Sequence, residues 1–209
     1  MGDAEWGSKE YKIMEAKQMK VIGINGSARK DGNTAIIMNR VFAELNREGI
    51  ETELIQLAGH PIRSCTACGS CGSRKNQKCM FTGDIIDECL EKILLADGLL
   101  LGSPTYFTDV TAEMKAFIDR VGFVARANDY MFKHKVGAGV IAVRRGGATH
   151  AFDTLNHFLH YMQMFLVGST YWNMVYGRNI GEVEKDEEGM ANMINLGQNM
   201  AYLLKKLNS

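Results

Sequence analysis

The hydrophobic and polar positions of this chain divide it into two alternating kinds of segment. Short, mainly apolar runs predict five buried strands, at residues 20–25, 51–57, 98–102, 136–143 and 169–175. Elsewhere the apolar residues recur every three or four positions, which predicts helices around residues 37–45, 84–95, 114–121, 150–165 and 190–207. Because most of the strands lack a polar face, we expect helices to cover both sides of the sheet that they form.

The alternation of strands and helices predicts an α/β fold with a doubly wound, five-stranded parallel sheet. Five such units fit the flavodoxin-like strand order 2-1-3-4-5, in which ligands bind beyond the carboxyl ends of the strands. The long segment 59–81 follows the second strand, so we expect it to open on the same edge as the loops after strands one, three and four. The acidic stretch 182–188 is predicted to be a solvated loop.

Length and charge limit the classes of protein that this chain can belong to. The 209 residues are 46% hydrophobic, enough for one domain, which we place at residues 19–209. Residues 1–18 are polar and lack the apolar core of a signal peptide, so we expect an arm that is disordered or part of a subunit interface. The 24 Lys and Arg balance the 24 Asp and Glu, which gives no reason to expect nucleic acid or a membrane as partner. We expect a cytoplasmic protein.

Four of the five cysteines lie within fifteen residues, at Cys65, Cys68, Cys71 and Cys79. Three thiolates at two-residue gaps can reach three corners of a [4Fe–4S] cube, and the fourth can come from a short distance along the chain. Zinc sites more often pair two knuckles across a longer interval, so the spacing favours a cluster over zinc. Redox thiols or cysteines without a ligand are the remaining alternatives. Cys89 lies on the apolar face of a predicted helix and is expected to be a core residue.

The loop after the first strand carries donors suited to a phosphate, namely Ser27, Arg29, Asn33 and Thr34. Neither GxxxxGK[ST] nor GxGxxG occurs, which excludes the two common nucleotide fingerprints and leaves a single monophosphate such as that of FMN. An ordinary helix start with Asn33 or Thr34 as the N-cap is the alternative.

Two further loops could hold a flat ring. After the third strand, Pro104 rigidifies a turn that carries Thr105 and two aromatic residues, Tyr106 and Phe107. After the fourth strand, the run Arg144, Arg145, Gly146 and Gly147 combines positive charge with close backbone approach. An arginine near N1 and O2 of a flavin would stabilise the reduced, anionic ring. The same arginines could bind the phosphate of a nicotinamide donor or lie on a solvated face.

Three segments together resemble the NAD(P)H-dependent FMN reductase group of flavodoxin-fold proteins: GSARKDGNT (26–34), SPTYFTDVTAEMKAFIDR (103–120) and VRRGGATHAFDTLNHF (143–158). With CxxCxxCx7C after the second strand, the chain is most similar to the iron–sulfur flavoproteins of that group. The resemblance implies noncovalently bound FMN, a cubane cluster on the four cysteines, and a homodimer or homotetramer that brings cluster and flavin together. It also implies which residues hold FMN: the phosphate at Ser27, Arg29, Asn33 and Thr34, and the ring at residues 104–107 and 144–147.

Three functions are compatible with these expectations. The first is an FMN-dependent oxidoreductase that takes electrons from a ferredoxin-like donor at the cluster, collects them on FMN, and passes them to a quinone, oxygen or peroxide. The second is an NAD(P)H-dependent FMN or quinone reductase with a structural cysteine loop, zinc-bound or metal-free. The third is a non-enzymatic flavin-binding redox sensor. The first requires no classical acid or base, and no catalytic residue is assigned.

Overall fold

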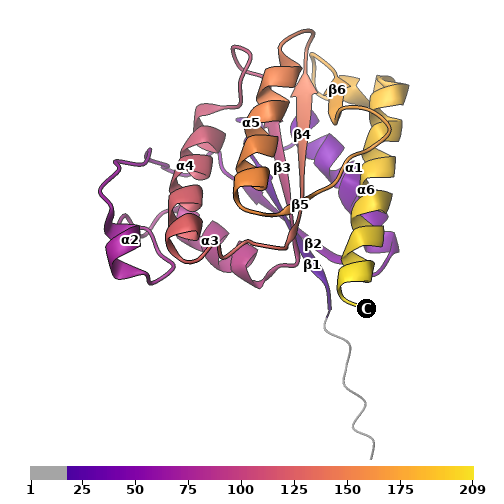
Figure 1. The fold of residues 1–209 in the computed structure, drawn as a ribbon. Helices are drawn as coiled ribbons and strands as arrows, with labels where there is room; N and C mark the ends of the chain where they lie inside the picture. Colours follow the sequence, from indigo (N-terminus) through magenta and orange to yellow (C-terminus); the bar gives the residue numbers. More distant parts are fainter. Residues whose placement is uncertain (1–17) are drawn as a thin grey trace, which may run out of the picture.

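The computed structural model describes residues 18–209, which form a parallel sheet with helices on both faces (Figure 1). The predicted arm 1–18 lies outside this range except for its last residue. The strands are β1 (Lys20–Asn25), β2 (Glu51–Gln56), β3 (Gly98–Pro104), β4 (Val136–Val143), β5 (Phe165–Leu166) and β6 (Met174–Tyr176). The helices are α1 (Asn33–Arg47), α2 (Ser70–Arg74), α3 (Ile85–Leu95), α4 (Ala112–Ala127), α5 (Ala148–Tyr161), the 3-10 helix η1 (Glu182–Lys185) and α6 (Glu187–Leu207).

The sheet has the order β2-β1-β3-β4-β5, and β6 also pairs with β4. Every strand pair is parallel, so the predicted α/β class and the predicted order 2-1-3-4-5 are confirmed. The strand next to β4 at the edge of the sheet differs from the prediction, because two short strands, β5 and β6, take the place of one continuous strand. β5 pairs with the start of β4, at Val136 and Gly137, and β6 pairs with its end, from Ile141 to Val143. Most of the predicted strand 169–175 is therefore a loop.

Two other predicted boundaries were wrong. The helix expected at 150–165 ends at Tyr161, since Phe165 and Leu166 pair with β4 instead. The acidic stretch 182–188 is not a loop, because it forms η1 and the first turn of α6. Its single apolar residue, Val183, is fully buried, and the Asp186 carboxylate accepts a hydrogen bond from the Gly189 N–H at 3.0 Å as the cap of α6.

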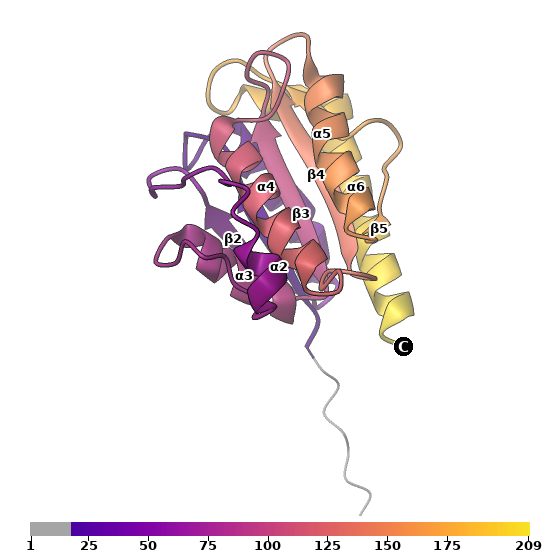
Figure 2. The ribbon, with the colours of Figure 1, turned by 60° about the vertical axis from the view of Figure 1, so that its left-hand side comes forward.

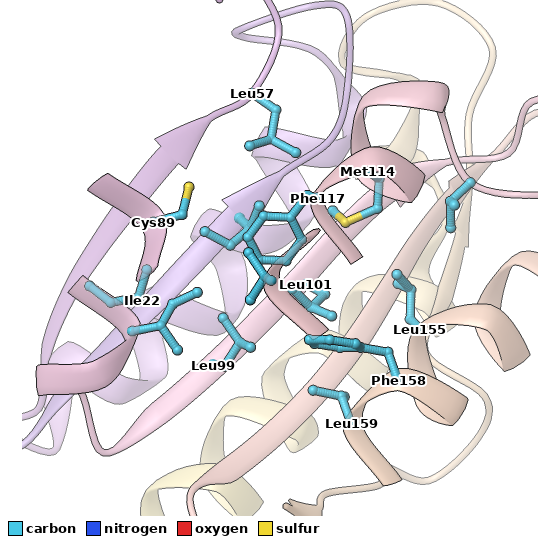
Figure 3. Packing of buried hydrophobic residues seen from close by; sticks show 14 of the residues in the cluster. Ile22, Leu57, Cys89, Leu99, Leu101, Met114, Phe117, Leu155, Phe158 and Leu159 are labelled. Carbon is cyan, nitrogen blue, oxygen red and sulfur yellow. The ribbon is translucent and has the colours of Figure 1, made fainter. Parts of the chain in front are cut away.

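Two apolar cores lie on the two faces of the sheet. Helices α3, α4 and α5 cover one face, and α1 and α6 cover the other (Figures 1 and 2). Figure 3 shows the first core, where Phe117 of α4 and Phe158 of α5 lie against the β3 side chains Leu99 and Leu101. Cys89 packs in this core and is fully buried, as predicted. None of the helices within residues 18–209 combines the length and the apolar character needed to cross a bilayer.

Helix α4 is fixed to the carboxyl edge of the sheet by its N-cap residue, Thr111. The Thr111 hydroxyl accepts a hydrogen bond from the Met114 N–H at 3.2 Å and donates one to the Gly26 carbonyl at 2.7 Å. The Ser103 hydroxyl also accepts a hydrogen bond from the Thr111 N–H, at 3.2 Å. These contacts join the ends of β1 and β3 to the start of α4 and fix the relative positions of the two loops that follow these strands.

Candidate functional site

The loop after β1 is shaped by its own side chains. The Asn25 side-chain oxygen accepts a hydrogen bond from the Ser27 N–H at 3.0 Å, and the Ser27 hydroxyl accepts one from the Arg29 N–H at 3.1 Å. The N-cap of α1 is Gly32, and no side chain caps the helix. The alternative of an ordinary helix start capped by Asn33 or Thr34 is therefore wrong. An uncapped helix N-terminus with free N–H groups is a favourable place for an anion.

This loop, the loop after β3 and the end of β4 surround one cavity of ≈ 180 Å³. Eight of the twelve predicted FMN-site residues line it: Ser27, Arg29, Asn33, Thr34, Pro104, Thr105, Tyr106 and Arg144. Three residues that sequence reasoning did not assign also line it, at Ala142, Gly177 and Arg178. The four predicted residues outside the lining are Phe107, Arg145, Gly146 and Gly147. The structure thus gathers donors from three loops around one cavity.

One donor in this cavity has no partner within the described residues. The Thr105 hydroxyl oxygen is buried from solvent and makes no hydrogen bond. A buried hydroxyl without a partner is unfavourable, so its retention at the wall of a polar cavity indicates a ligand that accepts or donates a hydrogen bond there.

The loop after β3 presents an aromatic side chain at the cost of backbone strain. Tyr106 and Asp109 pair through two backbone hydrogen bonds of 2.8 and 3.0 Å. The two residues between them, Phe107 and Thr108, have φ values of 49° and 68°, which residues other than glycine rarely adopt. Phe107 is fully exposed as a result. Strain of this kind persists where the surroundings enforce it, commonly at ligand sites.

Gly147 packs closely against Thr108 of the same loop. Its φ is 87°, and a Cβ atom there would lie 3.0 Å from Cγ2 and 3.2 Å from Cα of Thr108. The glycine run therefore serves close backbone packing in addition to the start of α5. Arg145 is exposed and outside the cavity, whereas Arg144 reaches it.

Asn33 organises a segment that sequence reasoning missed. Its amide nitrogen donates to the Asn179 carbonyl at 2.9 Å, and its amide oxygen accepts from the Gly181 N–H at 2.9 Å. The Glu182 carboxylate accepts two further backbone hydrogen bonds of 2.8 Å, from Arg178 and Asn179. These hydrogen bonds, those from Asn179 first, lower the pKa of Glu182 to about 2. The segment held in this way brings Arg178 to the cavity, which gives Asn33 a positioning role.

The cysteine segment does not stay at the edge where β2 ends. It turns back along α4, and the short helix α2 within it lies beside the C-terminal half of α4 (Figures 1 and 2). The Gln77 N–H donates to the side chain of Asn128, the C-cap of α4, at 3.0 Å. The prediction that the cysteine segment lies at the same edge of the sheet as the loops after β1, β3 and β4 was therefore wrong within one chain. Thr111 and Val124 are thirteen residues apart on α4, which is about 20 Å at the rise of an α-helix.

All four predicted metal ligands line one cavity of ≈ 110 Å³. The opposite wall consists of Phe81 and three residues of α4: Arg120, Phe123 and Val124. Within residues 18–209, no three His, Cys, Asp or Glu side chains are grouped as ligands of one ion. A zinc ion requires its sulfurs at about 2.3 Å from a single point, whereas a cubane takes each cysteine at a separate corner. Four cysteines on the wall of one cavity supply the number of thiolates that a cubane needs.

Three features of this cavity fit sulfur ligands that carry negative charge. The Ala67 N–H donates a hydrogen bond to the Cys65 sulfur, with 3.4 Å between the two atoms. The pKa of Cys68 is lowered by hydrogen bonds from the Ser70 side chain first and then its backbone. The Arg120 guanidinium is fully buried, with a nitrogen that has no partner among the described residues. Backbone donors and a buried cation are suited to thiolates bound to a cluster.

The family described as NADPH-dependent FMN reductase matches residues 19–178, which is most of the chain. The chain belongs to this family. An iron–sulfur flavoprotein of Methanocaldococcus jannaschii is 35% identical over 199 residues, which cover 90% of this chain and 98% of the relative. An iron–sulfur flavoprotein of Methanosarcina thermophila is 30% identical over 189 residues, 90% of this chain and 96% of the relative.

A flavodoxin from the domain Archaea has a similar structure, with a TM-score of 0.59, 16% identity, and coverage of 90% of this chain and 99% of that one. The flavodoxin-like fold is therefore confirmed. The sequence relatives confirm the resemblance to the iron–sulfur flavoproteins and the prediction of an FMN-dependent oxidoreductase.

Sequence reasoning missed two arginines, for different reasons. Arg178 follows a three-residue strand and no recognisable motif, so no local signal marks it. Arg120 lies within the segment 103–120, at helical spacing from Phe117 and Val124. A charged residue on the buried face of a predicted helix is a signal that could have been used, because such a residue needs a partner.

Proposed function

We propose that this FMN-dependent oxidoreductase passes electrons between a [4Fe–4S] cluster on the four cysteines and FMN, and on to a small acceptor such as a quinone, oxygen or peroxide. When bound, a cluster exchanges single electrons and FMN accepts one or two, so the pair would convert between the two kinds of transfer. The observation that carries the proposal is that four cysteine sulfurs and a buried cation line one cavity of a chain that has a separate, donor-rich cavity at the carboxyl edge of the sheet.

FMN would bind in the cavity at the carboxyl edge. The free N–H groups at the start of α1, with Ser27, Thr34 and the Arg29 guanidinium, would hold its phosphate. Thr105, Tyr106 and Arg144 would contact the ring, and Arg178 adds a positive charge to the same cavity. The Asn33 contacts to Asn179 and Gly181 would keep Arg178 in place.

The charge around the cysteines suits an acidic electron donor, such as a ferredoxin-like protein. No Asp or Glu occurs between Leu54 and Gly83, whereas this segment contains Arg63, Arg74, Lys75 and Lys78. All four are exposed. Lys78 forms an ion pair with Glu91 at 3.3 Å. The positive charge of the other three, next to the cluster cavity, would attract an acidic partner and orient it for electron transfer.

The two cavities share no lining residue within one chain, and a second subunit could bring a cluster and a flavin closer together. We propose a homodimer or homotetramer in which the cysteine cavity of one subunit faces the flavin cavity of another. Exposed aromatic side chains support association, since Phe123, Tyr161 and Phe107 are 46%, 54% and 103% exposed. A groove of ≈ 470 Å³ between α4 and α5, which includes Phe123 and Tyr161, adjoins the cysteine cavity.

The test is a visible spectrum of anaerobically purified protein with iron, sulfide, zinc and FMN assays. We expect flavin bands with a broad additional absorbance and about four irons per FMN. The Cys68→Ser variant should lose the iron and keep FMN, and the control variant Cys89→Ala should keep both, because Cys89 lies in the core. Flavin bands with zinc or without metal would refute the cluster.

A second candidate is an NAD(P)H-dependent FMN or quinone reductase with a structural cysteine loop. A cavity of ≈ 390 Å³ favours it, because it adjoins the proposed flavin cavity and its lining combines Arg144, Arg178 and Lys185 with the carboxylates of Glu182 and Asp186. The three cations outnumber the two carboxylates and could take the phosphates of a nicotinamide nucleotide. Stopped-flow mixing with NADPH separates the two functions: rapid bleaching of bound FMN in the iron-free Cys68→Ser variant would favour the second.

A further inference from the structure

Arg120 of α4 is the largest fully buried side chain in the described part of the chain, 1% exposed. A buried cation is tolerated only when its charge and its N–H groups are matched. One terminal nitrogen donates to the Asp84 carboxylate, and the other donates to the Phe81 carbonyl at 2.6 Å. The third nitrogen, Nε, is buried and has no hydrogen-bond partner among residues 18–209.

This arginine lines the cysteine cavity. Its lining includes all four sulfurs and no carboxylate, and Arg120 is its one charged cation. Asp84, the carboxylate that pairs with Arg120, is outside the lining. The charge next to Arg120 that comes from the cavity is therefore that of the cysteine thiolates. A buried cation with an unpaired N–H beside a cavity lined by four cysteines points to an anionic occupant.

We propose that Arg120 is a positioning residue of the cluster site, whose guanidinium faces the sulfurs and stabilises the more negative, reduced state of the cluster. This inference rests on the proposed function. Four thiolates outweigh the positive charge of the iron–sulfide core, so the cluster is anionic, and uptake of one electron from an external donor adds a negative charge without breaking a bond. A nearby cation favours that uptake and raises the reduction potential, and a nearby carboxylate opposes it.

The pair Arg120 and Asp84 allows a test with opposite expected signs. Arg120→Gln removes the cation and should lower the potential, whereas Asp84→Asn removes the anion and should raise it. Asn remains a good cap for α3, which begins after residue 84. If Arg120 only supported the fold through its contact with Asp84, both variants would break that contact and would shift the potential in the same direction or not at all.

The measurement is a dye-mediated redox titration of the anaerobic holoprotein, followed by the electron paramagnetic resonance signal of the reduced cluster. At the potential where half of the wild-type cluster is reduced, the ratio of reduced to oxidised cluster in Arg120→Gln should fall about tenfold, equivalent to 59 mV for one electron. Arg120→Lys, which keeps the charge, should shift the ratio less. Shifts of equal sign in Arg120→Gln and Asp84→Asn, or unchanged potentials in both, would overturn the inference and leave the proposed function intact.

Loss of the cluster in a variant is also informative. If Arg120→Gln contains FMN but no iron while Asp84→Asn retains iron, the cavity requires the cation, which supports the inference. If both variants lose iron, the arginine has only a structural role, which refutes it. Wild-type protein without iron would refute the proposed function and this inference together.

Discussion

The buried Thr105 hydroxyl leads to a prediction with opposite signs for stability and for binding. Thr105→Val replaces an unpartnered hydroxyl with a methyl group of similar size. An unsatisfied buried polar group costs on the order of 1–3 kcal/mol. Without FMN, the free energy of unfolding of the variant should therefore be about 1 kcal/mol higher than that of wild type, so the variant is the more stable protein. If that hydroxyl bonds to FMN, its loss should weaken binding by about 1.5 kcal/mol, roughly tenfold in Kd.

Thr111→Val is the matched control, because Thr111 is fully buried but its hydroxyl is satisfied on both sides. Removing this N-cap also leaves the Gly26 carbonyl unpaired, so we expect a loss of stability of about 2 kcal/mol. Urea unfolding of the two FMN-free variants gives the first quantity, and fluorescence titration with FMN gives the second. A Thr105→Val protein that is less stable than wild type and binds FMN equally well would refute the reasoning.

Three further predictions concern other parts of the chain. Gly197→Ala in α6 should destabilise the protein by about 2–3 kcal/mol, because its Cβ would lie 2.8 Å from the Val41 carbonyl oxygen. Gly122→Ala in α4 is the control and should be neutral or stabilising in thermal unfolding, since its Cβ would meet Phe158 at 3.4 Å. The pKa of Glu182 is lowered from 4.5 to about 2, so the stability that its ionised form contributes is present above pH 4.5 and is lost as pH falls towards 2; the difference in unfolding free energy between wild type and Glu182→Gln should shrink over that interval, and a constant difference would contradict the assignment. In metal-free protein, iodoacetamide should label the exposed Cys68 before unfolding and Cys89 only afterwards, because burial raises the pKa of Cys89 to about 12; mass spectrometry of native samples with Cys89 labelled would contradict this.

The sheet could be predicted from the sequence because its signals are local and repeated. Apolar runs such as 136–143 define the strands, and the intervening helical segments require parallel pairing. The burial of Cys89 followed from its position on one helix face. The fifth strand was misplaced because residues 165–166 and 174–176 are each too short to produce a strand pattern. They become strands only because their backbones pair with the exposed side of β4 in the folded protein.

The candidate site was predictable where residues of one loop act together and unpredictable where distant segments meet. Ser27 and Arg29 precede a helix, so their role can be inferred from local structure. Arg178 reaches the same cavity only through the Asn33 contacts to residues 179–181, which span nearly 150 positions of sequence. The predicted position of the cysteines was wrong because strand order determines at which edge a loop begins and does not determine the path that the loop then follows.

The gap in the fifth position has a consequence for how copies of this chain can assemble. Between the two short strands, the Asn173 side chain donates to the Gly139 carbonyl at 3.1 Å, and the Asn173 carbonyl accepts from the Ile141 N–H at 2.9 Å. A single asparagine thus takes up hydrogen-bonding groups of β4 that a continuous neighbouring strand would otherwise pair. An open edge invites strand addition and aggregation, and here that edge is already closed by the chain itself. A second copy of this chain should therefore not add a strand to β4, and association at this edge should use helix and loop surfaces.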